Sequence, residues 1–199
     1  MTLPGLHLLF AELPGPYRFH LSQSYTPEMD SWRAKSSPEA NTGNTNHDAF
    51  DDRAWHLTIE YKGQLAAYSR MIPGSDAYFR QIINVQGLMN TSDSIDWSRL
   101  VVPPAFKGLG LPLAMGYGCT LLAQATGMRY IHAAAEPARG LTSLIKLLGY
   151  CPVGEPSAIL VPSPPPFKLQ LFLLDLALPS LDLSQQLTQS WQSLALPKS

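Results

Sequence analysis

The stretch HDAFDDRAWHLTIEYKGQLAAYSRMIP, residues 47–73, predicts a tight β-hairpin with charged groups at both ends. Two apolar-rich segments, WHLTIEY (55–61) and QLAAYSRMI (64–72), are joined only by Lys62-Gly63. A two-residue connection that contains glycine favours a tight turn between antiparallel strands. Residues 55–72 are therefore expected to form one antiparallel hairpin.

Charged side chains stand beside or inside apolar runs here, where burial without a partner would be costly. Asp48 and Asp51 precede the first strand, Arg70 lies near the end of the second, and Arg99 lies in the next apolar segment. Taken singly, each has an ordinary explanation as a solvated turn or a structural ion pair. Together they are less easily explained as accidents, and they favour one shared polar cluster. Asp96 is three residues from Arg99 in a strand, so the two are expected on opposite faces.

The segments beyond the hairpin predict an alternation of strands and helices. IDWSRLVV (95–102) predicts a strand that Pro103-Pro104 ends, and a glycine loop and a helix follow it up to Gly127. A strand, a helix and a last strand are expected at 128–135, 138–149 and 168–176. The order predicts one α/β domain over residues 1–199, with a mobile N-terminal segment at 1–47 and a tail at 180–199 that could form a short amphipathic helix around Trp191.

The composition excludes several classes of function. The chain has 199 residues, 45% of them hydrophobic, and a net charge of −1, which gives no reason to expect nucleic-acid binding. No apolar run reaches the roughly 20 residues of a membrane span, and the N-terminus lacks a basic segment before its short apolar run. We therefore expect a soluble cytoplasmic protein. Residues 1–100 are acidic on balance and residues 101–199 basic, which favours a cationic and an acidic partner, respectively.

The loop Lys107-Gly108-Leu109-Gly110 opens the long helix and offers free backbone N–H groups at the positive end of the helix dipole. It predicts a cradle for the pyrophosphate of coenzyme A or phosphopantetheine; a simple glycine turn is the alternative. Phe106 and the apolar residues of the helix are expected in the core, and some of them could line an acyl tunnel.

Other catalytic patterns are absent from the sequence. The histidines show no metal-ligand spacing and Cys119 and Cys151 have no second thiol nearby, so no metal site is expected. There is no G-x-S-x-G nucleophile motif. The nearest Cys/His combination, Cys119 and His132, is interpreted as core packing.

The loop and the order of elements resemble the GNAT N-acyltransferases, although Ala105 stands where that family usually has Gln or Arg. Three further motifs resemble the LuxI-type acyl-homoserine-lactone synthases. They are D-A-F-D at 48–51 (an acid-x-aromatic-Asp pair), R-M-I-P at 70–73 (an Arg-Leu-x-Pro hairpin end) and D-W-S-R at 96–99 (a Glu-x-Ser-Arg strand). LIKLLGYCPVGEP at 144–156 is similar to the family's Gly-aromatic…Gly-Glu-Pro segment, and the resemblance covers roughly residues 45–175.

The resemblance implies a GNAT-like three-layer sandwich with a mixed, mostly antiparallel sheet, and it implies a reaction. The amino group of S-adenosylmethionine takes the acyl group of a thioester carried by acyl carrier protein or coenzyme A. Its carboxylate then attacks its own γ-carbon and expels methylthioadenosine, which closes a lactone. Both molecules are substrates, so no cofactor is implied.

The resemblance also assigns expected roles to residues. Asp96 would act as the base, beside the helix that follows the glycine loop, and a water may be needed because Asp is one methylene shorter than the family's Glu. Ser98 and Arg99 complete the expected catalytic set. Acceptor binding is expected at Trp32, Asp48, Asp51 and Arg70, and donor binding at Phe106, Lys107, Gly108 and Gly110. Asp48 and Asp51 would pair with Arg70 or Arg99 and so hold the N-terminal segment against the sheet, over the pocket for the charged acceptor.

Two departures leave the acceptor open. Leu21 and Tyr25 stand where the family has an arginine and a phenylalanine that enclose S-adenosylmethionine. The leading hypothesis is an acyl-homoserine-lactone synthase. The alternatives are an N-acyl amino acid synthase of the same fold and a non-catalytic, GNAT-like acyl-binding module.

Overall fold

The computed structural model describes residues 16–36, 47–74, 79, 92–137, 140–158, 168–177 and 189. Within them the chain forms a seven-stranded sheet in the order β1-β2-β3-β4-β5-β7-β6. Only the β4–β5 pair is parallel, so the predicted mixed, mostly antiparallel sheet is confirmed. The strands are β1 (Tyr17–Ser22), β2 (Trp55–Tyr61), β3 (Gln64–Pro73), β4 (Ser94–Val101), β5 (Tyr130–Ala135), β6 (Cys151–Ala158) and β7 (Lys168–Asp175).

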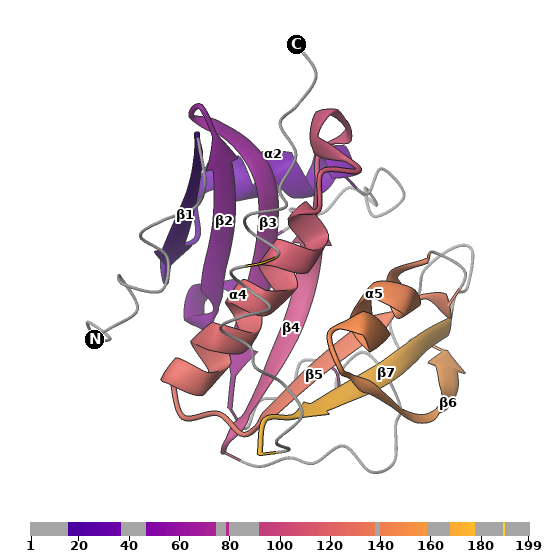
Figure 1. Ribbon diagram of the computed structural model, residues 1–199. Coiled ribbons are helices and arrows are strands. Elements are labelled where there is room, and N and C mark those ends of the chain that lie inside the picture. Colours follow the sequence, from indigo (N-terminus) through magenta and orange to yellow (C-terminus); the bar gives the residue numbers. More distant parts are fainter. Residues whose placement is uncertain are drawn as a thin grey trace.

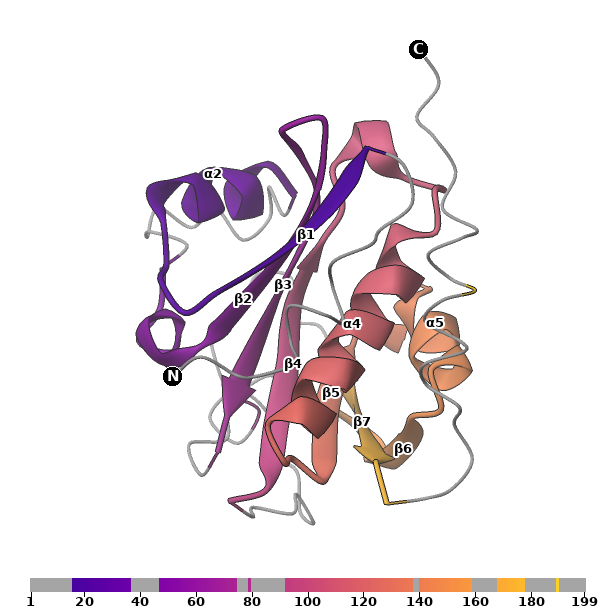
Figure 2. The same cartoon turned by 60° about the vertical axis from the view of Figure 1, so that its left-hand side comes forward.

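Helices cover both faces of this sheet, which makes the predicted three-layer sandwich (Figures 1 and 2). Helix α2 (Pro27–Ser36) covers one face, over β3 and β4, and we call this the α2 face. Helices α4 (Leu111–Ala125) and α5 (Leu141–Leu147) cover the other, which holds the main apolar core. Short 3-10 turns, η2 (Asp51–Arg53) and η3 (Pro104–Phe106), precede β2 and α4.

The β2–β3 hairpin forms as predicted, with Tyr61 paired to Gln64 across a two-residue turn. Lys62 and Gly63 both have positive φ, 50° and 76°, as a type I′ turn requires. Alternation along β3 then sends Ser69 and Met71 to the α4 side and Tyr68 and Arg70 to the α2 face.

A bulge near the end of β4 changes the direction of its side chains. Arg70 pairs with Ser98 and Tyr68 with Val101, so two residues of β4, Arg99 and Leu100, stand opposite one residue of β3. Arg99 takes the left-handed conformation there, with φ 58°. The bulge breaks the strand alternation and brings Arg99 to the α2 face, which it shares with Asp96; the expected placement on opposite faces is wrong.

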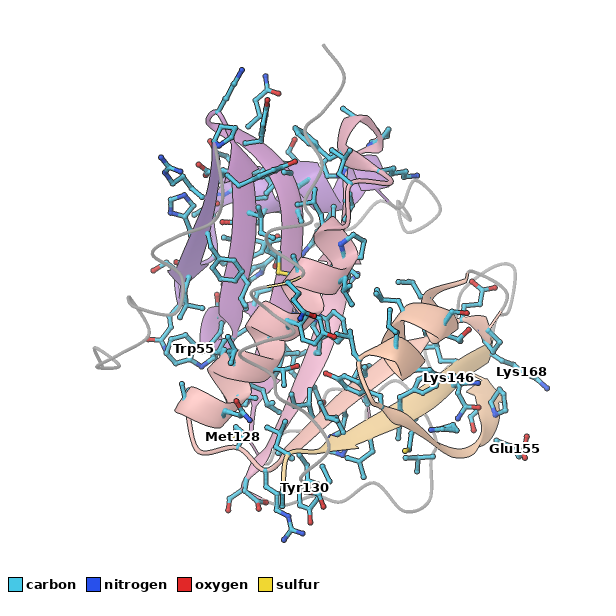
Figure 3. All side chains as sticks on the ribbon, viewed as in Figure 1. Trp55, Met128, Tyr130, Lys146, Glu155 and Lys168 are labelled. Atoms are coloured by element: carbon cyan, nitrogen blue, oxygen red, sulfur yellow. The ribbon has the colours of Figure 1, made fainter. Side chains whose placement is uncertain are left out.

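Strands β4 and β5 pair over only part of their length. Their register runs from Ser94↔Tyr130 to Trp97↔Ala133, and beyond this pair the strands diverge (Figure 1). Lys146, Glu155 and Lys168 project from the far edge formed by α5, β6 and β7, away from the α2 face (Figure 3).

Some elements differ from the sequence-based expectation. Strand β1 and helix α2 form within residues 17–36, where a mobile segment was expected, and β6 was not predicted. Residues 37–46 and the helix expected around Trp191 lie outside the described residues. In the part of the chain that the structure describes, no helix is both long and apolar enough to cross a membrane.

Candidate functional site

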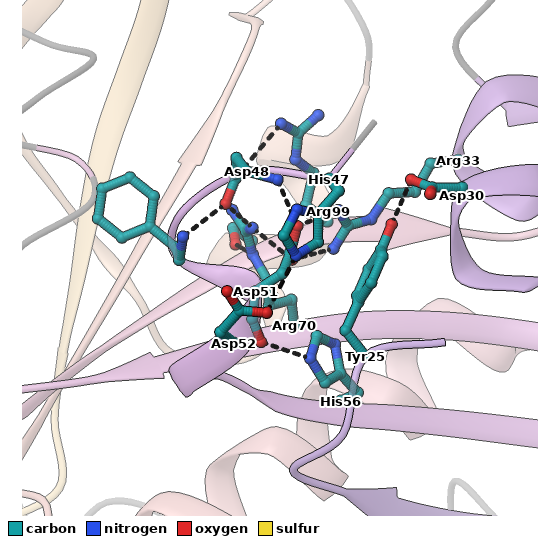
Figure 4. A network of polar contacts seen from close by, with 12 residues as sticks. Tyr25, Asp30, Arg33, His47, Asp48, Asp51, Asp52, His56, Arg70 and Arg99 are labelled. Atoms are coloured by element: carbon teal, nitrogen blue, oxygen red, sulfur yellow. Dashed lines mark hydrogen bonds and ion pairs between the residues drawn. The ribbon is translucent and has the colours of Figure 1, made fainter. Parts of the chain in front are cut away.

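A buried network of carboxylates and guanidinium groups occupies the α2 face (Figure 4). Asp51, fully buried in η2, accepts two hydrogen bonds from Arg33 of α2, Nη1 to Oδ2 at 2.8 Å and Nη2 to Oδ1 at 2.6 Å. Arg70 of β3, also fully buried, donates through Nη1 to Asp51 Oδ1 and to Asp48 Oδ1, each at 2.7 Å. The predicted cluster of Asp48, Asp51 and Arg70 is therefore confirmed, and it joins α2 to the sheet.

The network extends onto β4 through Ser98 and Arg99 of the D-W-S-R motif, which were expected to form the catalytic set together with Asp96. Arg70 Nε donates to Ser98 Oγ at 3.1 Å. Arg99 Nη2 donates to Asp48 Oδ2 at 3.3 Å, and both side chains are partly exposed, 33% for Arg99 and 27% for Asp48. The expected burial holds fully for Arg70 and only in part for Arg99. The pair of Arg99 and Asp48 therefore forms the edge of the network that faces solvent.

The charges of the network do not cancel. Three guanidinium groups, Arg33, Arg70 and Arg99, face two carboxylates, Asp48 and Asp51. Burial alone would raise the pKa of Asp51, but the hydrogen bonds from Arg33 and the charge of Arg70 hold that pKa well below its usual range. The carboxylate is therefore ionised at neutral pH, and the network carries one excess positive charge.

Two polar groups in contact with the network are uncharged. The Tyr68 hydroxyl accepts a hydrogen bond from Arg33 Nη2 at 2.6 Å, and His56 Nδ1 lies 3.0 Å from the same hydroxyl. Burial raises the pKa of Tyr68, and it lowers the pKa of His56. Both groups are therefore neutral near pH 7, and of the three arginines described in the network Arg99 is the one that reaches solvent.

An open pocket of about 500 Å³ lies beside the network, at the N-terminal end of α2. Asp30, Asp52, Tyr25 and His47 are among the residues that line it. The Tyr25 hydroxyl donates to Asp30, and the guanidinium of Arg33 lies 5.0 Å from the centre of the Tyr25 ring. Trp32, which was expected to bind the acceptor, is not among the lining residues; it packs with Met29 and Tyr68 in the apolar contact between α2 and the sheet.

The glycine loop forms the predicted turn from strand to helix. Gly108 and Gly110 have φ 77° and 83°, and Gly110 is the N-cap residue of α4. Lys107 and both glycines are exposed, whereas Phe106 is buried against Tyr61, with ring centroids 6.0 Å apart. The exposed turn lies at the end of the sheet where β4 and β5 diverge (Figure 1). Leu111 is buried, Pro112 has no N–H group, and the N–H of Leu113 donates to the carbonyl of Gly110, so the first turn of α4 does not present the expected row of free N–H groups at the surface.

Asp96 lies on the α2 face rather than beside α4, because Ile95 and Trp97 are the β4 residues that pack on that helix side. Its Oδ1 is 3.0 Å from His132 Nδ1 on β5, and its Oδ2 accepts the backbone N–H of Phe79 at 3.2 Å. His132 was expected to be core packing near Cys119. Both are buried, but Cys119 lies on α4 near Ser69, on the other side of the sheet.

Two residues of this site were not predicted from the sequence. Arg33 lies in a helix of low amphipathicity and pairs with an acid 18 positions away, so no local pattern marks it. His132 is aligned with Asp96 only by the parallel β4–β5 register. Within the described residues no group of three or more His, Cys, Asp and Glu side chains could hold a metal ion.

No protein-family model matches the chain, and no curated protein matches it. Its structure is similar to that of MesI, a CoA-dependent acyl-homoserine lactone synthase, with a TM-score of 0.60 at 17% identity over 88% of this chain and 95% of that chain. BjaI, another such synthase, solved with SAM and isopentyl-CoA, gives a TM-score of 0.60 at 13% identity over 87% of each chain.

An acetyltransferase of Bacillus subtilis in complex with CoA gives a TM-score of 0.57 at 13% identity, over 80% of this chain and 99% of that chain. Identities this low establish the fold and leave the activity open. The resemblance seen in the sequence is confirmed at the level of the fold: the chain has a GNAT-like acyltransferase fold, similar to those of CoA-dependent acyl-homoserine lactone synthases and of GNAT acetyltransferases.

Proposed function

We propose that this chain is an N-acyltransferase that makes an acyl-homoserine lactone from S-adenosylmethionine and an acyl thioester. The observation that carries the proposal is the excess positive charge exposed at Arg99, on the face opposite α4 and near the point where β4 and β5 diverge. An acceptor with a carboxylate and an amine fits this arrangement, because its carboxylate would neutralise Arg99 while its amine reaches towards the β4–β5 opening.

The donor site is proposed at the glycine turn. The exposed backbone at Gly108 and Gly110, with the charge of Lys107, would hold the phosphates or amides of the phosphopantetheine arm. The acyl chain would then enter between β4 and β5. Coenzyme A and acyl carrier protein both present this arm, and the structural similarity to CoA-dependent synthases favours coenzyme A.

The acceptor site is proposed over the α2 face. Arg99 would bind the carboxylate, and Asp48 and Arg70 would hold Arg99 and Ser98 in place. The adjoining pocket, with Asp30 and Asp52 in its lining, would suit a cationic sulfonium group. Trp32 would contribute by packing α2 onto the sheet, without touching the acceptor.

The reaction then follows in two steps. The acceptor nitrogen attacks the thioester carbonyl, so that a C–N bond forms, the C–S bond breaks and the thiol leaves with a proton. The carboxylate oxygen of the acyl product next attacks its own γ-carbon. The bond from that carbon to the sulfonium sulfur breaks, and methylthioadenosine leaves as a neutral thioether.

A second candidate is the acylation of a free amino acid. Tyr25, which stands where the family's enclosing phenylalanine is expected, lines the pocket and donates its hydroxyl to Asp30. This makes the pocket wall more polar than a phenylalanine would. An amino acid without an adenosyl group would use the same Arg99 carboxylate site.

Purified protein should be incubated with S-adenosylmethionine, or with a mixture of amino acids, and with acyl-CoA or acyl carrier protein of several chain lengths. We expect mass spectrometry to show an acyl-homoserine lactone and methylthioadenosine in equal amounts. An acyl amino acid instead would support the second candidate, and no acylated product with any donor would leave a non-catalytic binding module.

Arg99→Ala tests the proposed carboxylate contact. A hydrogen bond to a charged group contributes about 1.5–3 kcal/mol, so we expect the KM for the acceptor to rise about 10- to 100-fold, with a smaller change in the KM of the donor. Arg129→Ala is the matched control, because Arg129 is an exposed arginine that pairs with Asp175 away from the site. An unchanged acceptor KM in Arg99→Ala would contradict the proposed contact.

A further inference from the structure

The buried pair of Asp96 and His132 on the α2 face has the geometry of an oriented general base. The two residues stand directly opposite each other in the parallel β4–β5 register, and each is 2% exposed. Asp96 Oδ1 lies 3.0 Å from His132 Nδ1, and Asp96 Oδ2 is held by the backbone N–H of Phe79. The carboxylate is therefore fixed through both oxygens, and it fixes the plane of the imidazole ring in turn.

The contact with Asp96 determines which nitrogen of His132 carries the proton. A carboxylate oxygen accepts hydrogen bonds, so the contact favours the imidazole tautomer in which Nδ1 carries the proton and donates to Asp96. Nε2 then carries the lone pair. This Nε2 is buried and has no hydrogen-bond partner among the residues that the structure describes. A buried acceptor without a partner is costly and unusual, so the site is built to receive a donor from outside the protein.

The position of the pair points to the reacting groups. Asp96 and His132 are one aligned pair of the β4–β5 register. Only the pair Trp97↔Ala133 follows before the two strands diverge. On one side of them lies the charged network. Ser98, two residues after Asp96 on β4, accepts a hydrogen bond from Arg70 of that network. On the other side the face is apolar, with Leu173 opposite His132 on β7, and with Ala134 packed in a cluster that includes Phe79 and Leu171.

We propose that His132 is the general base that accepts the proton of the acceptor amine, and that Asp96 is the residue that positions it. This inference rests on the proposed function. As the amine nitrogen forms its bond to the thioester carbonyl, one of its N–H protons passes to Nε2, and Asp96 stabilises the imidazolium. The C–S bond then breaks with its electron pair on sulfur. The same proton passes from Nε2 to that sulfur, so the imidazole is regenerated and the thiol leaves neutral.

The shorter side chain of Asp96 is consistent with this role. A glutamate at this position would carry its carboxylate one methylene further and into the space that the imidazole occupies. Asp96→Glu therefore distinguishes two roles. If Asp96 were itself the base, Glu would keep the function; if His132 is the base, Glu displaces the ring and activity falls.

The test compares wild-type protein with His132→Gln, Asp96→Glu and the control His20→Gln, whose imidazole is exposed on β1. Single-turnover acylation should be measured with S-adenosylmethionine, or with an amino acid mixture, and acyl-CoA. We expect His132→Gln and Asp96→Glu to lower the rate by about 10²- to 10⁴-fold, with acceptor KM little changed and His20→Gln like the wild type.

Thermal unfolding establishes that each variant is folded, and ¹⁵N NMR of the wild-type histidines reports the tautomer without any turnover. A folded His132→Gln with a wild-type rate, or an Nε2–H tautomer in the wild type, would overturn the role of His132. Acylation of an amino acid in place of S-adenosylmethionine would overturn only the proposed acceptor. If the wild type acylated no amine at all, both proposals would fall.

Discussion

Asp51 is the residue on which the buried network depends, because it is the shared partner of Arg33 and Arg70 and has no exposure to solvent. Removing one partner from a buried ion pair leaves an uncompensated charge, which typically costs about 3–5 kcal/mol. We therefore expect Asp51→Asn to lower the free energy of unfolding by about that amount, measured by urea denaturation at pH 7.

Asp52 provides the control for this change, since it is the next residue in the chain and its side chain is 75% exposed. Asp52→Asn should change the unfolding free energy by less than about 0.5 kcal/mol. Equal effects of the two substitutions would show that the pairing of Asp51 contributes little to stability.

The sequence predicted most of this network but neither Arg33 nor the nearby His132, and the reason is physical. Asp48, Asp51, Arg70 and Arg99 stand next to apolar runs, so their need for partners is visible from local context. Arg33 sits in a polar helix, where an arginine is unremarkable. His132 gains its partner only from the β4–β5 register, a long-range pairing that no local pattern encodes.

At the scale of elements, the hairpin shows what local sequence determines well. Its turn needs positive φ at both central residues, which Gly63 adopts freely and Lys62 does not. We expect Gly63→Ala to destabilise the protein by about 1 kcal/mol and Lys62→Asn to stabilise it by a few tenths, measured by urea denaturation. A Cβ at Gly63 would have no atom within 4 Å, so backbone conformation alone would cause the loss.

The elements that the sequence did not predict lack such local signals. Helix α2 has little amphipathic character, and its docking depends on Arg33 and a small apolar contact around Met29. Strand β6 begins with Cys-Pro and contains Gly154 and Pro156, a composition that argues against a strand. It forms at the sheet edge, paired only to β7, where such residues are tolerated.

In the molecule as a whole, the two faces of the sheet respond differently to pH. The α4 face is held by apolar packing, whereas the α2 face is held in part by buried ionisable groups. The two groups there whose pKa is lowered, Asp51 and His56, change stability in the same direction as the pH falls. The pKa of Asp51 is lowered by its arginines and that of His56 by burial, so below the ordinary pKa of each group the unfolded chain binds more protons than the folded protein.

This difference predicts how stability falls in acid. The contribution of Asp51 is complete above the unfolded carboxyl pKa of about 4 and is lost as the pH falls below it towards the lower, folded value. We expect the unfolding free energy of the wild type to drop steeply between about pH 4 and pH 2, and that of Asp51→Asn to be lower at pH 7 and flatter over this range. Both proteins should be measured in the same stabilising osmolyte. Asp175→Asn is the control, because it removes a partly exposed carboxylate whose pKa is also lowered, by the hydrogen bond from Arg129. It should leave in place most of the drop in unfolding free energy between about pH 4 and pH 2. An Asp51→Asn curve parallel to that of the wild type would assign the acid sensitivity to other carboxylates.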